Sequence, residues 1–205
     1  METRQYLDAA ARQLNTLLTG TQLDSLLNYL EMIKKWNRAY NLVGTSSTDE
    51  LLQKHILDSL SIMQFIQMSP VLDVGSGAGL PGIPLAIALP DISFTLLDSN
   101  GKKARFMRQV ALELKLDNVE VVQTRVENYH PDAAPRTVMS RAFAPLEKAL
   151  QSMTSVCAPL GQVLIMLGTK PIQQPSHNAI KRLQISSINL PGLDSQRHLL
   201  IADKV

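Results

Sequence analysis

A glycine-rich turn between an expected strand and an expected helix constrains the fold of this chain more than any other feature. Residues 71–82 read VLDVGSGAGLPG, an apolar run followed by closely spaced glycines. Glycine has no Cβ, so such a turn can adopt left-handed backbone conformations and lets a ligand approach the main chain. Pro81 and Pro84 are compatible with the first turn of a following helix. We therefore predict a strand, a ligand-binding turn and a helix in succession.

Apolar runs alternate with helical stretches after Pro70, at residues 71–75, 94–98, 119–123, 137–141 and 162–167. This alternation is typical of a parallel sheet with helices on both faces. Residues 183–190 and 197–203 are also rich in β-formers, and the chain between them is too short for a parallel crossover. We predict an α/β, Rossmann-like fold with a mostly parallel seven-stranded sheet that ends in an antiparallel hairpin.

The residues before Pro70 carry helical periodicity, with expected helices at 3–18, 22–40 and from Ser47 to Gln67. Thr21 with Asp24 resembles a capping box, and Ser47 with Glu50 resembles a second one. We expect residues 1–69 to form a helical extension packed on a core of residues 70–205. With 205 residues, the two parts fit one compact unit.

Composition excludes several classes of protein. Apolar residues make up 45% and charged residues 19%, which is a globular mixture. Cys157 is the single cysteine, so an intrachain disulfide and a multi-cysteine zinc site are both excluded, and we expect no metal. The apolar stretch 83–90 is too short to span a membrane. We expect a cytoplasmic monomer that does not associate with membranes.

The glycine turn fits two classes of nucleotide cofactor. Gly77, Gly79 and Gly82 satisfy the G-x-G-x-x-G fingerprint of dinucleotide-binding proteins, which would suggest an NAD-linked oxidoreductase. Asp73 argues against that class, because a carboxylate beside the ligand repels a pyrophosphate and attracts the ammonium and sulfonium of S-adenosylmethionine. Asp98 ends the second strand, where an acid can bind the ribose hydroxyls of either cofactor. The sequence therefore favours S-adenosylmethionine.

A less favoured interpretation makes Asp73 a cap of the following loop and Asp98 a solvated turn residue. Adenine is expected near Arg125, Val126 and Glu127 at the end of the third strand, where a surface salt bridge is an equally good interpretation. Other side chains near this edge also have two interpretations. Arg141 ends the fourth strand and is expected to bind the cofactor carboxylate or a substrate phosphate, although an ion pair with an acid at the edge of the core is the alternative. His55 is interpreted as a structural histidine that is hydrogen-bonded at an interface.

The net charge of +2 is too small to indicate nucleic-acid binding by itself. Local charge is more informative, because Lys102, Lys103, Arg105 and Arg108 are four cations with no acid among them. A solvated helix face is the default interpretation. Their helix begins beside the expected ligand edge, however, close to Arg125, so these cations could follow a nucleic-acid backbone. Aromatic residues are sparse, and Trp36, Tyr40 and Phe143 are the candidates to stack on one extruded base.

The kind of acceptor can be narrowed by elimination. Methylation at carbon 5 of a pyrimidine needs a cysteine thiolate, but Cys157 is expected at the wrong edge of the sheet. The Asn/Asp-Pro-Pro-aromatic motif of enzymes that methylate exocyclic amines is absent from residues 140–145, which read SRAFAP. A ring nitrogen such as guanine N7 carries a lone pair at neutral pH and needs alignment but no general base. The sequence is compatible with such an acceptor.

Segments along nearly the whole chain resemble the RsmG (GidB) family of bacterial 16S rRNA guanine-N7 methyltransferases. The segments are 40–42, 55–59, 73–82, 97–99, 101–103, 140–142 and 197–198, which read YNL, HILDS, DVGSGAGLPG, LDS, GKK, SRA and RH. The resemblance implies a class I S-adenosylmethionine-dependent methyltransferase fold. It also implies methyl transfer to N7 of one guanine in the decoding-region loop of 16S rRNA, in the small ribosomal subunit or its assembly intermediate. A non-catalytic RNA-binding assembly factor with the same fold is the alternative.

The resemblance also implies roles for individual residues, with Arg141 positioning the reactants. Contacts to the cofactor are expected, from both lines of reasoning, at Asp73, Gly75, Gly77, Gly79, Leu80, Asp98, Val126, Glu127 and Arg141. Contacts to RNA are expected at Lys102, Lys103, Arg125, Lys170 and Arg197. One position departs from the family, which usually has a lysine before the glycine that ends the fifth strand, whereas this chain has Leu167 before Gly168. Lys170 is the expected substitute.

Overall fold

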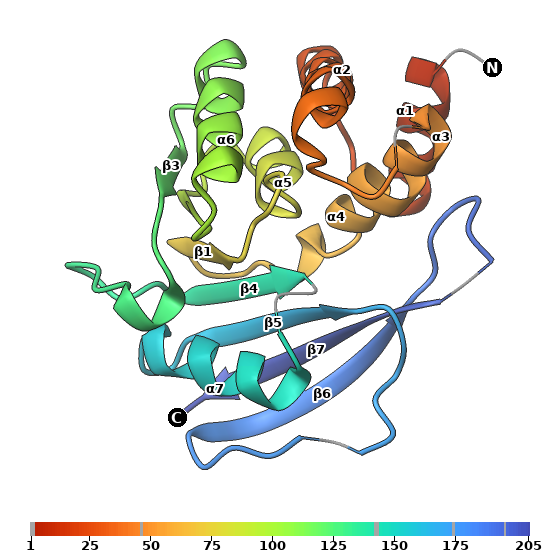
Figure 1. Ribbon diagram of the computed structural model, residues 1–205. Coiled ribbons are helices and arrows are strands. Elements are labelled where there is room, and N and C mark those ends of the chain that lie inside the picture. The colour runs from red at the N-terminus through yellow and green to blue at the C-terminus, as the bar shows by residue number, and fades with distance from the viewer. Residues whose placement is uncertain (1–2, 46, 142–143, 174, 195) are drawn as a thin grey trace.

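The computed structural model describes residues 3–45, 47–141, 144–173, 175–194 and 196–205. Its centre is a seven-stranded sheet with the strand order β3-β2-β1-β4-β5-β7-β6 (Figure 1). The first five strands pair in parallel, as the alternating pattern predicts. They are β1 (Val71–Val74), β2 (Phe94–Leu97), β3 (Val119–Val122), β4 (Thr137–Arg141) and β5 (Gln162–Leu167).

The strand order changes direction between β1 and β4, which lie side by side at the middle of the sheet. Every residue of β1 is buried, which explains its continuous apolar character apart from Asp73. In open α/β sheets, ligands bind outside the carboxyl ends of the strands at such a change of direction. The glycine turn that follows Val74 and the side chain of Arg141 both lie at this edge.

The two final strands form the predicted antiparallel hairpin, from β6 (Ile180–Ile188) and β7 (Arg197–Lys204). β7 pairs antiparallel with β5 as well, with Leu167 opposite His198. The last strand therefore lies between β5 and β6, and the beginning of β7 meets the end of β5 at the carboxyl edge of the parallel strands. This arrangement brings Arg197 to the same edge as Arg141.

Helices cover both faces of the sheet, but unequally (Figure 1). One face carries α5 (Gly82–Ala88) and α6 (Gly101–Glu113), and the N-terminal helices α1 (Thr3–Gln13) and α2 (Gly20–Tyr40) pack alongside them. A single cluster of buried apolar side chains joins Leu7, Leu26 and Ile56 to Leu96 of β2. The other face carries α7 (Leu146–Val156), and the short 3-10 helix η3 (Val126–Asn128) follows β3. The boundary expected at residue 70 stays a prediction.

Two N-terminal details differ from the sequence analysis. α1 ends at Gln13 rather than at residue 18, and Asn15 just beyond it has a left-handed φ of 55°. The capping box of α2 is formed by Thr19 and Gln22, not by Thr21 and Asp24. Gln22 N–H donates to Thr19 Oγ1 at 3.2 Å, and Gln22 Oε1 accepts from Thr19 N–H at 2.8 Å. Both pairs match the pattern S/T-x-x-E/Q, if Asp is accepted in place of Glu. The reciprocal hydrogen bonds form at Thr19, whose backbone is extended as an N-cap requires.

The third expected helix is interrupted. It begins as α3 (Thr48–Leu51) with Ser47 as its N-cap, as predicted, and then widens into a π-helix, η1 (Leu52–Leu57). α4 (Asp58–Leu60) and the 3-10 helix η2 (Met63–Phe65) complete it. A π-helix shifts the backbone hydrogen bonds by one residue and is often found at functional sites. Lys54, His55 and the start of α4 take their positions from this widened turn.

None of the helices in the described ranges is long and apolar enough to cross a membrane. Within the same ranges, no group of three or more His, Cys, Asp and Glu side chains is placed to hold a metal ion. Cys157 is buried at the end of α7, where its Sγ lies 3.6 Å from the carbonyl oxygen of Gln162, the first residue of β5. The thiol is thus at the edge opposite to the glycine turn, as expected, and burial raises its pKa to about 11.

Candidate active site

The turn after β1 uses the conformational freedom of its glycines. Gly75, Gly77 and Gly79 have φ values of 70°, 61° and 89°, in the left-handed region that L side chains rarely adopt. A Cβ on Gly79 would lie 2.5 Å from Cδ1 of Ile83. A Cβ on Gly82 would collide with Leu96 of β2. The glycines therefore permit both the sharp turn and the close packing of α5 on the sheet.

Asp73 lies beneath this turn and faces its backbone. Its side chain is fully buried, and Oδ2 accepts a hydrogen bond from Gly82 N–H at 3.0 Å. Burial raises the pKa of Asp73 to about 7, while hydrogen bonds from Gly82 and Ser76 act in the opposite direction. The carboxylate lines neither of the two cavities described below. It caps the turn, which is the interpretation that the sequence analysis disfavoured.

Asp98 lies directly after β2, and its carboxylate connects two turns. Oδ2 accepts from Gly77 N–H at 2.9 Å, and Oδ1 accepts from Asn100 N–H at 2.8 Å. Asn100 in turn caps α6 by accepting hydrogen bonds from Lys102 and Lys103. Asp98 is 8% exposed and lines a cavity. It is therefore a cavity residue that also holds the glycine turn in place, and its expected contact with the ribose stays a prediction.

Two cavities flank the glycine turn at the carboxyl edge of the sheet. The smaller has a volume of ≈ 340 Å³, and the larger has a volume of ≈ 530 Å³. The smaller one is lined, among others, by Val74, Asp98, Arg125, Val126, Glu127 and Lys148. The larger one is lined, among others, by Lys54, His55, Asp58, Leu80, Arg141 and Arg197. Gly75 and Lys103 line both, so the two cavities meet at the turn.

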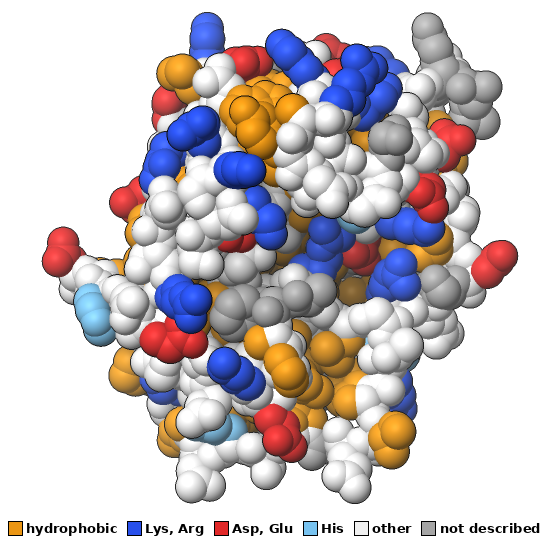
Figure 2. All heavy atoms as spheres, in the orientation of Figure 1, with side chains coloured by type: hydrophobic (Ala, Val, Ile, Leu, Met, Phe, Trp, Pro, Cys, Tyr) orange, Lys and Arg blue, Asp and Glu red, His pale blue; other side chains and the backbone are white. Residues whose placement is uncertain are grey.

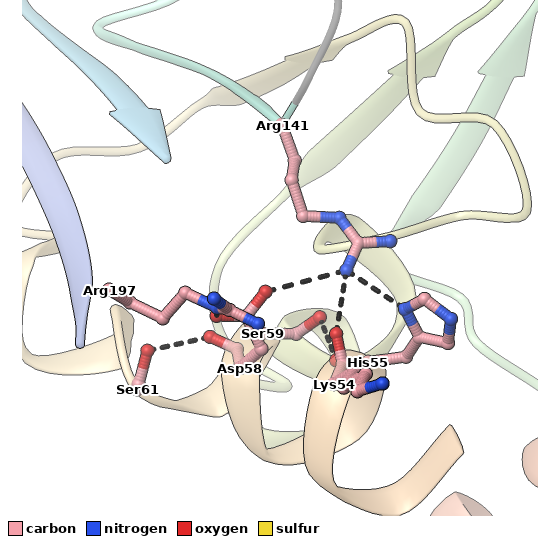
Figure 3. Close-up of polar contacts among 7 residues, drawn as sticks. All are labelled: Lys54, His55, Asp58, Ser59, Ser61, Arg141 and Arg197. Carbon is pink, nitrogen blue, oxygen red and sulfur yellow. Dashed lines mark hydrogen bonds and ion pairs between the residues drawn. The ribbon is translucent and has the colours of Figure 1, made fainter. Parts of the chain in front are cut away.

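Arg141 extends from the end of β4 to the N-terminal helices, where one nitrogen makes three contacts (Figure 3). Its Nη1 donates to the backbone carbonyl of Lys54 at 3.0 Å, lies 3.0 Å from Nδ1 of His55 and is 3.4 Å from Oδ2 of Asp58. The other oxygen of Asp58 is 3.6 Å from Nε of Arg197. Both the ligand-facing role and the ion pair considered for Arg141 are therefore compatible with its position.

The electrostatics of this cluster favour a neutral histidine. Burial, together with the positive charge of Arg141, lowers the pKa of His55 to about 4. Neutral imidazole can accept the hydrogen bond from Arg141 at Nδ1. Burial raises the pKa of Asp58, whereas Arg141 and Arg197 oppose that rise. His55 is thus hydrogen-bonded at an interface, as expected, but it also lines the larger cavity.

The residues expected to contact RNA are spread over several surfaces. Lys103, Arg125 and Arg197 line cavities, whereas Lys170 is exposed and lines neither. Lys102 lies over the ring of Tyr40, 5.9 Å from its centroid. Figure 2 shows several Lys and Arg side chains over the middle of this face of the molecule. Phe143, a candidate for base stacking, lies outside the described residues.

Trp36 and Tyr40, the other stacking candidates, pack against each other with ring centroids 5.3 Å apart. Trp36 also packs on Phe106 of α6 at 5.3 Å, and Phe106 in turn stacks on Tyr29 of α2. The hydroxyl of Tyr29 donates to the carbonyl of Ala78 at 2.6 Å. These aromatic residues therefore connect the N-terminal helices to the glycine turn, and Tyr40 alone among them is exposed.

Comparison with known proteins identifies the family. The family model GidB, described as rRNA small subunit methyltransferase G, matches residues 22–200. The chain is a member of the GidB family. It is 44% identical to the ribosomal RNA small subunit methyltransferase G of Pseudomonas syringae pv. tomato, over 96% of this chain and 94% of that protein. It is 46% identical to the protein of the same name from Pseudomonas fluorescens, over 96% and 93%.

Solved structures with a similar fold extend beyond the GidB family. A magnesium protoporphyrin IX methyltransferase from Synechocystis, solved with bound S-adenosylmethionine, aligns with a TM-score of 0.58 at 14% identity, covering 86% of this chain and 97% of that one. The S-adenosylmethionine-dependent methyltransferase SibL aligns with a TM-score of 0.59 at 15% identity, covering 88% and 69%. These likenesses concern the fold alone, and they bear out the class I methyltransferase fold.

Several lining residues of this GidB chain were not singled out from the sequence. Lys54, Asp58 and His198 line the larger cavity, and Lys148 lines the smaller one. Asp58 carried a signal, because it is an acid directly after the apolar residues Ile56 and Leu57 in a stretch of expected helix. Nothing in the sequence signalled Lys54, because Arg141 contacts its backbone carbonyl, which the π-helix exposes. Leu167, the position at which the sequence analysis expected a departure from the family, lines the larger cavity.

Proposed function

We propose that this chain is an S-adenosylmethionine-dependent methyltransferase that methylates N7 of one guanine in the decoding-region loop of 16S rRNA. The observation that carries the proposal is the pair of cavities that meet at the glycine turn in a member of the GidB family. One cavity can take a nucleoside, and the other can take the reactive end of the cofactor together with an acceptor base.

The residues of the smaller cavity fit an adenosine. Apolar side chains of Val74, Leu97 and Val126 offer surfaces for a base, and Asp98 offers acceptors for ribose hydroxyls. The glycine turn fits the rest of the cofactor, because Gly77 has no side chain where the two cavities join. A Cβ on Gly77 would point into this region and would lie 4.0 Å from Nζ of Lys103. S-adenosylmethionine supplies a methyl group on a positively charged sulfur, which makes that methyl electrophilic.

The larger cavity provides positive charge for anionic groups. Arg141, Arg197 and Lys103 line its wall, whereas the ammonium of Lys54 pairs with Glu50. We assign Arg141 to the carboxylate of the cofactor or to a phosphate of the RNA, and Arg197 and Lys103 to the RNA. Guanidinium groups suit both kinds of anion, because they bind carboxylates and phosphates in a bidentate way. Arg141 would hold the reactants in position.

The acidic and imidazole side chains of this cavity support an acceptor that needs no deprotonation. Asp58 is paired with two arginines, and Nδ1 of His55 faces Arg141. A guanine N7 lone pair can attack without a general base, so its methylation depends on alignment and exclusion of water. A cavity wall in which arginines hold the Asp58 carboxylate and Nδ1 of His55 is compatible with such a reaction.

The test is methylation of ribosomal subunits by the purified chain. Radiolabelled S-adenosylmethionine and small subunits that lack the modification should yield label on one guanine, at N7, in the decoding-region loop of 16S rRNA. Mass spectrometry of nuclease digests locates the label. Label at another base or position would contradict the proposed acceptor.

Two further outcomes would contradict the proposal in different ways. Salt-sensitive binding to rRNA without any methyl transfer would favour a non-catalytic assembly factor. Stabilisation by NAD but not by S-adenosylhomocysteine would favour an oxidoreductase. Naked 16S rRNA, mature subunits and assembly intermediates should be compared as substrates in the same assay, because the proposal includes the subunit or its precursor as the partner.

A further inference from the structure

Asp58 lies between Arg141 and Arg197, two arginines that line the larger cavity and come from different strands. It is the first residue of α4, and its side chain is 6% exposed. Arg141 comes from the end of β4, and Arg197 comes from the start of β7. One carboxylate oxygen is 3.4 Å from Arg141, and the other is 3.6 Å from Arg197. A single buried carboxylate thus lies between two cations from separate segments.

The surroundings hold this carboxylate in place. The backbone carbonyl of Asp58 accepts a hydrogen bond from the hydroxyl of Ser61 at 2.6 Å, and the preceding π-helix presents Lys54 and His55 to the same nitrogen of Arg141. Two arginine charges against one carboxylate leave an excess of one positive charge at the cavity wall. A further anionic group is therefore attracted, and a neutral His55 does not change that balance.

All three contacts of Arg141 described above use Nη1, and Figure 3 shows its other terminal nitrogen pointing away from Asp58. Among the described residues, Oδ1 of Asp58 has no hydrogen-bond partner closer than the ion pair with Arg197. The two arginines therefore leave part of the hydrogen-bonding capacity of the carboxylate unused, but the carboxylate orients both of them. Side chains that are pre-oriented in this way lose less conformational freedom when they bind an anion.

We propose that Asp58 is a positioning residue, which orients Arg141 and Arg197 so that together they hold an anionic group in the larger cavity. The inference rests on the proposed function and assigns Asp58 no contact with the reacting atoms. The anionic group is a carboxylate or a phosphate, and it can come from the cofactor or from the RNA backbone. The experiment distinguishes these two sources.

The experiment compares Asp58→Asn and Asp58→Glu with wild type, and Asp24→Asn serves as a matched control. Asp24 is exposed on α2 and pairs with Arg4 at 2.9 Å. Calorimetry measures the Kd for S-adenosylhomocysteine without RNA, filter binding measures the Kd for small subunits, and kinetics give KM and kcat. Asp58→Asn should raise at least one of the two Kd values, and the matching KM, by about tenfold with kcat within about threefold of wild type. Asp24→Asn should change none of them.

The pattern of losses identifies the anion and tests the role. A loss of affinity for S-adenosylhomocysteine indicates the cofactor carboxylate, and a loss for subunits indicates a phosphate. Asp58→Glu keeps the charge but moves the carboxylate by one methylene group, so positioning predicts a loss in this variant too. This second variant keeps the test decisive if Asp58→Asn does not fold. In an Arg141→Gln background, Asp58→Asn should add less than about twofold, because neighbouring residues that act together are not additive.

Four results would overturn the inference. Three of them are unchanged Kd and KM values in Asp58→Asn, full retention of affinity in Asp58→Glu, and an undiminished effect of Asp58→Asn in the Arg141→Gln background. A lower kcat and a lower Tm with unchanged KM would indicate a merely structural role and would also overturn it. A wild-type chain that binds S-adenosylhomocysteine but methylates no rRNA would instead contradict the proposed function, and the binding arm for Asp58 would still be interpretable.

Discussion

The carboxylate of Asp98 accepts a hydrogen bond from the backbone N–H of Gly77 at 2.9 Å, which ties the end of β2 to the turn after β1. The two residues are 21 positions apart, and the parallel pairing of β1 with β2 brings them together. One side chain thus shapes the glycine turn and faces the smaller cavity. The first prediction follows from this double role.

Asp98→Ala should weaken binding of S-adenosylhomocysteine by at least about tenfold, because it removes both a ribose acceptor and the anchor of Gly77. Isothermal calorimetry measures the affinity. Asp117→Ala, which changes an exposed aspartate beyond α6, is the matched control and should bind as wild type does. An affinity within twofold of wild type in Asp98→Ala would refute the assignment of Asp98 to the cofactor.

Gly79→Ala should destabilise the fold by about 1–3 kcal/mol or more, because a φ of 89° is unfavourable for alanine and its Cβ would meet Ile83. Urea unfolding measures the free energy. Gly44→Ala is the control, since no atom lies within 4 Å of the Cβ position there. Equal stability of the two variants would show that the turn can relax around a side chain.

The buried acid beneath the turn predicts a specific pH dependence of stability. The pKa of Asp73 rises from 3.8 to about 7 in the folded chain, so the folded state holds the proton more tightly than the unfolded state does. The resulting stabilisation is complete below pH 3.8 and is lost as the pH rises to about 7. Relative to wild type, Asp73→Asn should therefore be more stable at pH 8 than at pH 5.

Unfolding free energies of both proteins across this range provide the measurement. The comparison between variant and wild type removes the contribution of His55 and other groups that titrate in both. Asp91→Asn, at an exposed aspartate, controls for the substitution itself. A difference that does not change with pH would mean that Asp73 is ionised throughout the range.

Arg141→Ala should reduce kcat/KM for methylation by about a hundredfold or more, because the side chain would hold an anionic reactant. It should also lower the free energy of unfolding by roughly 1–3 kcal/mol, since the buried Asp58 loses one of its cations. Methylation assays and urea unfolding measure the two effects. Arg136→Ala, at an exposed arginine, is the control. Unaltered turnover in Arg141→Ala would exclude the assigned role.

Leu167→Lys should tighten binding to small subunits and make that binding more sensitive to salt. Leu167 lines the larger cavity, so a lysine there would add a cation beside Arg141 and Arg197. Each additional phosphate contact with a single strand steepens the dependence of log affinity on log salt by about 0.7. The control is Leu160→Lys, which adds the same charge at an exposed position away from the cavity. Identical slopes for the two variants would argue against an RNA contact at this position.

The sheet could be predicted from the sequence because each strand carries its own signal. Five apolar runs alternate with helices, and the six residues between 190 and 197 are too few for a crossover, so the hairpin had to be antiparallel. The position of β7 between β5 and β6 could not be derived in this way, since strand order depends on packing between distant segments. The edge of the sheet at which Asp98, Val126 and Arg141 meet follows from parallel pairing alone.

The orientation of individual side chains was harder to predict. Asp73 was expected beside the ligand, but its carboxylate turns inward to Gly82, because a backbone N–H at the start of α5 lies within reach. The role of the helix before β1 was also missed, since periodicity gives no indication that residues 52–57 widen into a π-helix. That widening presents Lys54 and His55 to Arg141, which lies more than 80 residues later in the chain.

Gly75 and Lys103 belong to the walls of both cavities, so whatever fills one cavity becomes part of the boundary of the other. If a guest on one side shifts either residue, the affinity on the other side changes, and linkage then requires each guest to change the affinity of the other by the same factor. The total free energy of forming the ternary complex does not depend on which of the two guests binds first. Through these two residues, binding in one cavity can therefore affect binding in the other.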